Sequence, residues 1–142
     1  MKITQATEYR EAIVNLLRTE KLPADDLPGA LDDFRVVVKN KELAGIAGLE
    51  VYGSYGLLRS LAVQTAYRNQ GIAAQLLHEV ESLAVTKGLK ALYLFTQTAP
   101  DYFSRKNYTQ ISRADVPAEV QQSTEYSHVC PQSAIVMKKV FK

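Results

Sequence analysis

Apolar and polar residues along this chain follow two different periods, and the change of period separates expected strands from expected helices. Residues 34–39, 43–52 and 57–63 are rich in alternating and β-branched positions, which is typical of strands. Asn40-Lys41 and residues 53–56 supply turn-forming residues between them. The three strands are therefore predicted to form an antiparallel meander.

Helical spacing begins at Gly71 and continues to Lys87. One face of this segment collects the apolar residues Ala73, Leu76, Leu77, Val80, Leu83 and Ala84. Gly88 follows as a C-terminal glycine cap. Residues 91–98 then predict a strand that is apolar on both faces, as expected at the centre of a covered sheet.

The two ends of the chain complete this order. Residues 1–5 predict a first strand, and Thr7 is expected to cap a helix with acidic residues in its first turn. The other predicted elements are a loop at residues 22–29, a short helix from Pro100 to Asn107, a strand pair at residues 108–113 and 133–141, and a connection at residues 114–132 with a short helix near Pro117. This order predicts one α/β domain over residues 1–142, with helices on both faces of a mixed sheet.

Composition narrows the classes of function. The 142 residues are 46% hydrophobic with a net charge of +2, so we expect a packed core and no nucleic-acid surface. No apolar run approaches the roughly 20 residues of a membrane span, and the chain does not begin like a secretory signal. Cys130 is the single cysteine, which excludes an internal disulfide and suggests a cytoplasmic location. One cysteine and two histidines are too few for a metal site, so none is expected.

The junction after Val63 has the chemistry of a phosphate-binding loop. The first N–H groups of a helix lack internal acceptors, and the helix dipole favours an anion there. Gly71 allows the backbone to approach a phosphate closely, Ala73 keeps the next turn slim, and Arg68 adds a guanidinium suited to phosphate. The Gly-Lys-Ser/Thr of a Walker loop and the glycines of a dinucleotide loop are absent. The alternative is a plain strand-to-helix turn with a solvated arginine.

Arg68-x-x-Gly71-x-Ala73 resembles the pyrophosphate signature of the GNAT superfamily of acetyltransferases. The resemblance implies a mostly antiparallel α+β sheet, acetyl-CoA as acyl donor, and a backbone segment that pairs with the pantetheine arm. It assigns to cofactor binding the residues Leu61, Ala62, Val63, Arg68, Asn69, Gln70, Gly71, Ile72 and Ala73, with Thr96 at the end of the next strand. A homodimer is also expected by analogy.

A narrower resemblance is to the arsenic-resistance N-acetyltransferase-like subgroup. It rests on Leu22-Pro23-x-x-Asp26-Leu27, Gly48-Leu49-Glu50, Leu57 to Val63, and Cys130-Pro131-x-Ser133-Ala134. These segments span most of the chain, but the subgroup name does not specify an acceptor.

The chain departs from the family where a general acid is usual. The family pattern Phe-Tyr-x-x-x-Gly-Phe aligns with residues 102–108, and its tyrosine position falls on Phe103, which has no proton to donate. Tyr102 is adjacent but points about 100° away around a helix. Tyr102 is therefore a candidate acid only if the helix is shifted by one residue, and otherwise it is a half-buried aromatic residue.

Glu50 and Arg59 are the charged residues best placed for catalysis on the strands before the loop. An even hairpin turn would put them directly opposite each other on one face of the sheet. Transfer to an amine requires a neutral amine, so Glu50 could act as a base and Arg59 could anchor an acidic acceptor. The equal alternative is a structural ion pair.

The sequence therefore predicts transfer of an acetyl group from acetyl-CoA to the amine of a small molecule by direct attack. Because Phe103 occupies the usual acid position, the alternative is a non-catalytic module that binds or senses acyl-CoA. Cys130 and His128 could form a nucleophilic pair, but no third, orienting group is evident in the sequence.

Overall fold

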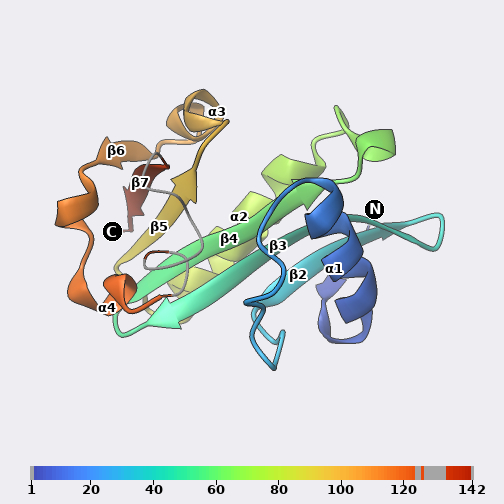
Figure 1. The fold of residues 1–142 in the computed structure, drawn as a ribbon, viewed down its shortest axis with the longest axis horizontal. Helices are drawn as coiled ribbons and strands as arrows, with labels where there is room; N and C mark the ends of the chain where they lie inside the picture. Colours follow the sequence, from blue (N-terminus) through green and yellow to red (C-terminus); the bar gives the residue numbers. More distant parts are fainter. Residues whose placement is uncertain (1, 124–125, 127–133, 142) are drawn as a thin grey trace. The chain divides into compact units, whose positions relative to one another are not determined.

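The computed structural model describes residues 2–123, 126 and 134–141. Within these residues, seven strands form one sheet in the order β1-β2-β3-β4-β5-β7-β6 (Figure 1). The strands are β1 (Lys2–Gln5), β2 (Phe34–Lys39), β3 (Glu42–Tyr52), β4 (Tyr55–Val63), β5 (Ala91–Thr96), β6 (Thr109–Ile111) and β7 (Ile135–Val140). The helices are α1 (Arg10–Thr19), α2 (Ile72–Thr86), α3 (Pro100–Arg105) and α4 (Ala118–Gln121), with short 3-10 turns η1 (Thr7–Tyr9), η2 (Thr65–Tyr67) and η3 (Arg113–Asp115). The predicted mixed, mostly antiparallel α/β fold is confirmed.

The chain divides into two compact units, which are described separately. The first contains Met1–Leu49 and Arg59–Leu83, and the second contains Glu50–Leu58 and Ala84–Lys142. The proposal of a single functional domain over residues 1–142 stays a prediction. Within the described residues, no helix is long and apolar enough to cross a membrane.

The core of the first unit explains why its sheet carries a helix on each face. Ile13 and Leu17 of α1 are fully buried in a cluster with Ile46 of β3, and Figure 1 shows α1 lying against β2 and β3. On the neighbouring residue Gly45, a Cβ would lie 3.0 Å from side-chain atoms of both Ile72 and Leu76 of α2. Successive strand residues face opposite sides of a sheet, so α1 and α2 cover opposite faces of β3.

The antiparallel pairing of β2 with β3 follows the predicted turn. Asn40 and Lys41 have φ angles of +53° and +64°, the left-handed pair that matches the twist of a hairpin. The register runs from Phe34↔Gly48 to Lys39↔Glu42, with a shift between Val37 and Val38.

Gly48 is required by close packing rather than by its backbone angle. A Cβ at this position would lie 2.4 Å from Cε2 of the Phe34 ring on the paired strand. We therefore expect Gly48→Ala to lower the free energy of unfolding by about 2 kcal/mol, because the buried ring has to move. Urea unfolding measures this loss. Gly29→Ala is the control, since no atom lies within 4 Å of its added Cβ, and equal stability of the two variants would contradict the packing argument.

The first helix begins differently from the prediction. Ala6 occupies the cap position of η1, and neither η1 nor α1 has a side-chain cap, so Thr7 is not the predicted N-cap. Ala6 is fully buried, and Tyr9 N–H donates to Ala6 O at 2.9 Å. The buried entry of the chain thus imposes a tight 3-10 turn, which delays the α-helix until Arg10.

The second unit is built around β5. This strand pairs in parallel with β4 from Tyr55↔Ala91 to Leu57↔Tyr93, and antiparallel with β7. β7 also pairs with β6, which confirms the predicted final strand pair in a shorter form. β5 ends at Thr96 rather than at the predicted Thr98, because Thr96 Oγ1 accepts from Ala99 N–H at 3.1 Å and turns the chain into α3.

Candidate functional site

The loop between β4 and α2 has the open backbone that a phosphate site requires. Asn69 and Gly71 have φ angles of +64° and +78°, which curl the chain before the helix. A Cβ at Gly71 would have no atom within 4 Å, so this backbone is accessible from that side. Gln75 N–H donates to Gly71 O at 3.1 Å, and the N–H groups of residues 72–74 precede this first helical bond. The helix starts at Ile72, one residue later than predicted.

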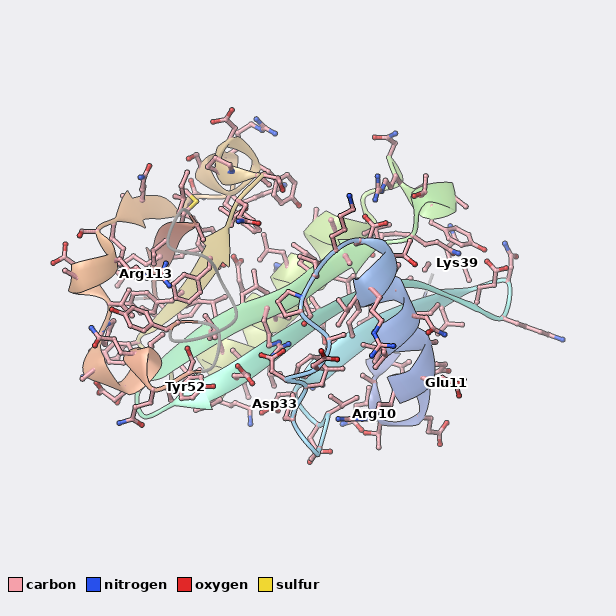
Figure 2. The ribbon with its side chains drawn as sticks, in the orientation of Figure 1. Arg10, Glu11, Asp33, Lys39, Tyr52 and Arg113 are labelled. Carbon is pink, nitrogen blue, oxygen red and sulfur yellow. The ribbon has the colours of Figure 1, made fainter. Side chains whose placement is uncertain are left out.

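The β2–β3 hairpin holds this loop in place. Tyr67 is buried, and its hydroxyl donates to Glu42 Oε2 at 3.0 Å. Lys39 Nζ donates to Gln70 Oε1 at 2.6 Å, and Figure 2 shows Lys39 near the hairpin turn at the end of β2. These two contacts, which the sequence did not reveal, fix the loop on both sides of Arg68.

Arg68 presents a charge that a ligand can reach. Its side chain is 47% exposed, while its Nε donates to Val63 O at 3.3 Å. Its Nη2 forms an ion pair with Glu20 Oε1 at the end of α1. The guanidinium is therefore oriented by the strand that precedes it and partly neutralised by a carboxylate.

The segment that leads into the loop is strained in its middle. Ser60 has a φ angle of +62° within β4, which is rare for a residue other than glycine. Ala62 beyond it is buried in the core of the first unit, and Gln64 N–H donates to Ala44 O at 2.8 Å. Leu61 and Val63, which flank Ala62 in the predicted pantetheine segment, are both half-buried.

Arg59 makes a buried ion pair that the sequence did not reveal. Its Nη1 and Nη2 donate to the two carboxylate oxygens of Asp26, each at 2.8 Å. Its Nε donates to Ser60 Oγ at 3.0 Å, and Nη2 also reaches Pro23 O at 3.5 Å. All three nitrogens have acceptors, and the side chain is only 1% exposed. These contacts favour the structural interpretation of Arg59 over an anchor for an acceptor.

Glu50 belongs to the second unit, and its observed partner there is Tyr52. The Tyr52 hydroxyl donates to Glu50 Oε1 at 3.1 Å, from two residues further along β3. Residues two apart on a strand share a face, so the contact follows from the strand itself. Because Glu50 and Arg59 lie in different units, the predicted pairing of the two stays a prediction.

Two neighbouring residues of α3 differ in role: Phe103 is a core residue, and Tyr102 is the candidate general acid. Phe103 is 7% exposed and packs edge-on against Tyr102 and Tyr108, with ring centroids 5.3 and 5.7 Å away. The hydroxyl oxygen of Tyr102 is buried, and Lys106 Nζ lies 5.6 Å from the centre of its ring. Phe103 is thus a packing residue, while Tyr102 remains the nearest phenol to the expected acid position.

In the second unit, the pKa of one tyrosine is shifted, and this shift does not suggest a catalytic group. Burial raises the pKa of Tyr93, and the nearby Tyr55 and Glu119 raise that pKa further. The Tyr93 phenol therefore stays neutral at physiological pH. Among the described residues, no group of His, Cys, Asp and Glu could hold a metal ion. Cys130 and His128 lie outside the described residues.

The turn from β4 into α2 thus combines the open backbone of Gly71 with the exposed guanidinium of Arg68, which is an arrangement suited to an anion. A sequence model of the acetyltransferase (GNAT) family matches residues 7–111. The chain belongs to this family.

Solved structures of low sequence identity share the fold. Rv2747 from Mycobacterium tuberculosis, solved in complex with CoA, is 23% identical with a TM-score of 0.84, and the match covers 100% of both chains. A GNAT-family acetyltransferase from Staphylococcus aureus is 20% identical with a TM-score of 0.79, covering 99% of each chain. N-acetylglutamate synthase from Neisseria gonorrhoeae, solved with CoA and N-acetyl-glutamate, is 14% identical with a TM-score of 0.81 over 99% of this chain and 35% of that one.

Proposed function

We propose that this protein transfers an acetyl group from acetyl-CoA to the amine of a small molecule. The observation that carries the proposal is the loop at residues 68–71, where the exposed guanidinium of Arg68 stands beside an open backbone at the start of α2. Such a loop suits a pyrophosphate, since both the helix start and the guanidinium favour anions. Family membership and CoA-bound neighbours support the same cofactor.

The reaction needs no covalent enzyme intermediate. The neutral amine attacks the thioester carbonyl carbon, the C–N bond forms, the C–S bond breaks, and CoA leaves as a thiolate that takes up a proton. We assign removal of the amine proton to Glu50, whose carboxylate is held by the Tyr52 hydroxyl. Tyr102 is the candidate donor of the proton to the thiolate.

Two measurements test this function. Calorimetry with acetyl-CoA should show binding at micromolar concentration, and a thiol-release assay with a panel of amines should show turnover. The panel should begin with amino acids such as L-glutamate, because one similar structure is an N-acetylglutamate synthase. Absence of acetyl-CoA binding would contradict the proposal as a whole.

Phe103 supports a second candidate function, which is acyl-CoA binding without turnover. This residue fills the usual tyrosine position with a packed ring that has no proton to donate. Tight binding of acetyl-CoA with no thiol release across the amine panel would favour this sensing role over catalysis.

Glu50→Gln is the variant that tests the base. Removing the carboxylate should lower kcat about 100-fold, because proton transfer by a placed group contributes on the order of 10² or more. The affinity for acetyl-CoA should not change. Glu8→Gln on the exposed turn η1 removes the same charge and should keep full activity. An unchanged kcat in Glu50→Gln would remove Glu50 from the mechanism.

The subgroup and the oligomeric state are inferred from resemblance. The segments at Asp26, Glu50 and Arg59 support membership of the arsenic-resistance N-acetyltransferase-like subgroup. Family analogy supports a homodimer. Contacts of the pantetheine arm with Leu61 to Val63 and with Thr96 are part of the same proposal. Light scattering of the purified chain tests the dimer.

A further inference from the structure

The loop at residues 68–71 already has an anionic group beside it, the carboxylate of Glu20. Four charged side chains of the first unit meet around it, and each has an identified partner: Arg68 pairs with Glu20, Lys39 donates to Gln70, and Glu42 accepts from Tyr67. Among these four side chains, the positive charges of Arg68 and Lys39 are matched by the negative charges of Glu20 and Glu42. A diphosphate that binds Arg68 therefore also meets the carboxylate of Glu20.

The position of Glu20 at the end of α1 gives no reason, in terms of helix stability, for an acidic residue there. Glu20 is the C-cap of α1, with its N–H donating to Leu16 O at 3.0 Å. The C-terminal end of a helix carries partial negative charge, so an acid there is unfavourable for the helix. The backbone also fixes its position, since Lys21 has a φ angle of +59° and Leu22 N–H donates back to Leu17 O at 2.8 Å.

Burial differs between the two partners of this ion pair. The Glu20 side chain is 19% exposed, whereas the Arg68 side chain is 47% exposed. The carboxylate thus sits on the protein side of the pair, and the guanidinium is the member that a ligand can reach. A phosphate that binds Arg68 has to share it with Glu20 or displace Glu20 from it.

We propose that Glu20 is a built-in competitor for Arg68 that sets the affinity of the loop for CoA. The inference rests on the proposed function, because it takes the pyrophosphate of CoA as the ligand of Arg68. Glu20 lowers the affinity for any anion at the loop and reserves the site for ligands with enough charge to outcompete a carboxylate. The cofactor can then leave after each reaction instead of remaining bound.

Calorimetry with CoA on the full chain tests this role. Glu20→Gln should bind CoA about 2- to 5-fold more tightly than the wild type at ~50 mM salt, the scale of a partly exposed ion pair. The gain should shrink at ~500 mM salt, because ions screen the competing charge. Glu11→Gln is the matched control, since Glu11 lies in the first turn of the same helix (Figure 2), about 13 Å along its axis from Glu20. Its affinity for CoA should equal that of the wild type.

A double-mutant cycle with Arg68→Ala shows whether Glu20 acts through the guanidinium. In the Arg68→Ala background, Glu20→Gln should no longer increase the affinity. An affinity of Glu20→Gln that equals or falls below that of the wild type would overturn the inference while leaving the proposed function intact, because CoA still binds. A gain that persists without Arg68 would overturn it as well. If neither the wild type nor Glu20→Gln binds CoA, the proposed function fails and the inference fails with it.

Discussion

Asp26→Ala is expected to lower the free energy of unfolding by about 3 to 5 kcal/mol, because it removes one partner of a buried ion pair. Arg59 is 1% exposed, and both Asp26 carboxylate oxygens accept from it at 2.8 Å. The guanidinium cannot lose its proton in this environment, since arginine stays charged in proteins. Urea unfolding followed by circular dichroism measures the loss.

The chain offers a matched control next to Asp26. Asp25 also forms an ion pair, with Arg18 at 3.3 Å, but these two side chains are 94% and 66% exposed. Asp25→Ala should therefore leave the urea midpoint nearly unchanged, because exposed ion pairs contribute little. Equal midpoints for Asp25→Ala and Asp26→Ala would refute the claim that burial gives the Asp26 pair its importance.

A double replacement separates the lost charge partner from lost packing. Asp26→Leu combined with Arg59→Met removes both charges and keeps apolar volume at both positions. This variant should be more stable than Asp26→Ala, since replacing both members of a buried ion pair by apolar residues costs less than removing one member. If it is less stable than the single variant, then the shape of the loop at residues 22–29, and not the charge, determines the stability.

The order of elements could be predicted because it is encoded locally. The period of apolar residues predicted α2 and the strands around it, and Gly88 has the expected left-handed φ of +75° after the helix. Asn107 likewise has a φ of +74° after α3, as its side chain allows. The errors lie at element ends, as at Thr7 and Thr98. There, a buried neighbour or one side-chain hydrogen bond decides where the element begins or ends.

The contacts of the candidate site were not encoded locally. Asp26 lies 33 residues before Arg59 in the chain, and Glu20 lies 48 residues before Arg68. No periodicity joins such residues, so only the folded chain brings them together. The sequence did suggest that a buried charge at Arg59 requires a partner. What it could not supply was the identity of the partner in the loop after α1.

Arg68→Ala is expected to weaken CoA binding about 100-fold. A hydrogen bond to a charged group contributes about 1.5 to 3 kcal/mol, and Arg68 would donate one such bond to the pyrophosphate, which corresponds to a loss of up to about 100-fold. The loss should affect binding and not folding, because the Arg68 side chain is 47% exposed and partly exposed ion pairs contribute little to stability. Calorimetry with CoA and a thermal unfolding curve of each variant separate the two effects.

Arg18→Ala is the strict control for this experiment. It removes the same charge from the last turn of α1, close to Glu20 in the chain, yet Arg18 pairs with Asp25 and not with the loop. Its affinity for CoA should stay within about twofold of the wild type, because the lost charge is 66% exposed and screened by salt. Arg68→Lys should recover part of the affinity, since lysine restores the charge without the fork geometry. If Arg68→Ala binds CoA as well as Arg18→Ala does, the pyrophosphate does not lie at this loop, and the cofactor site has to be sought elsewhere on the chain.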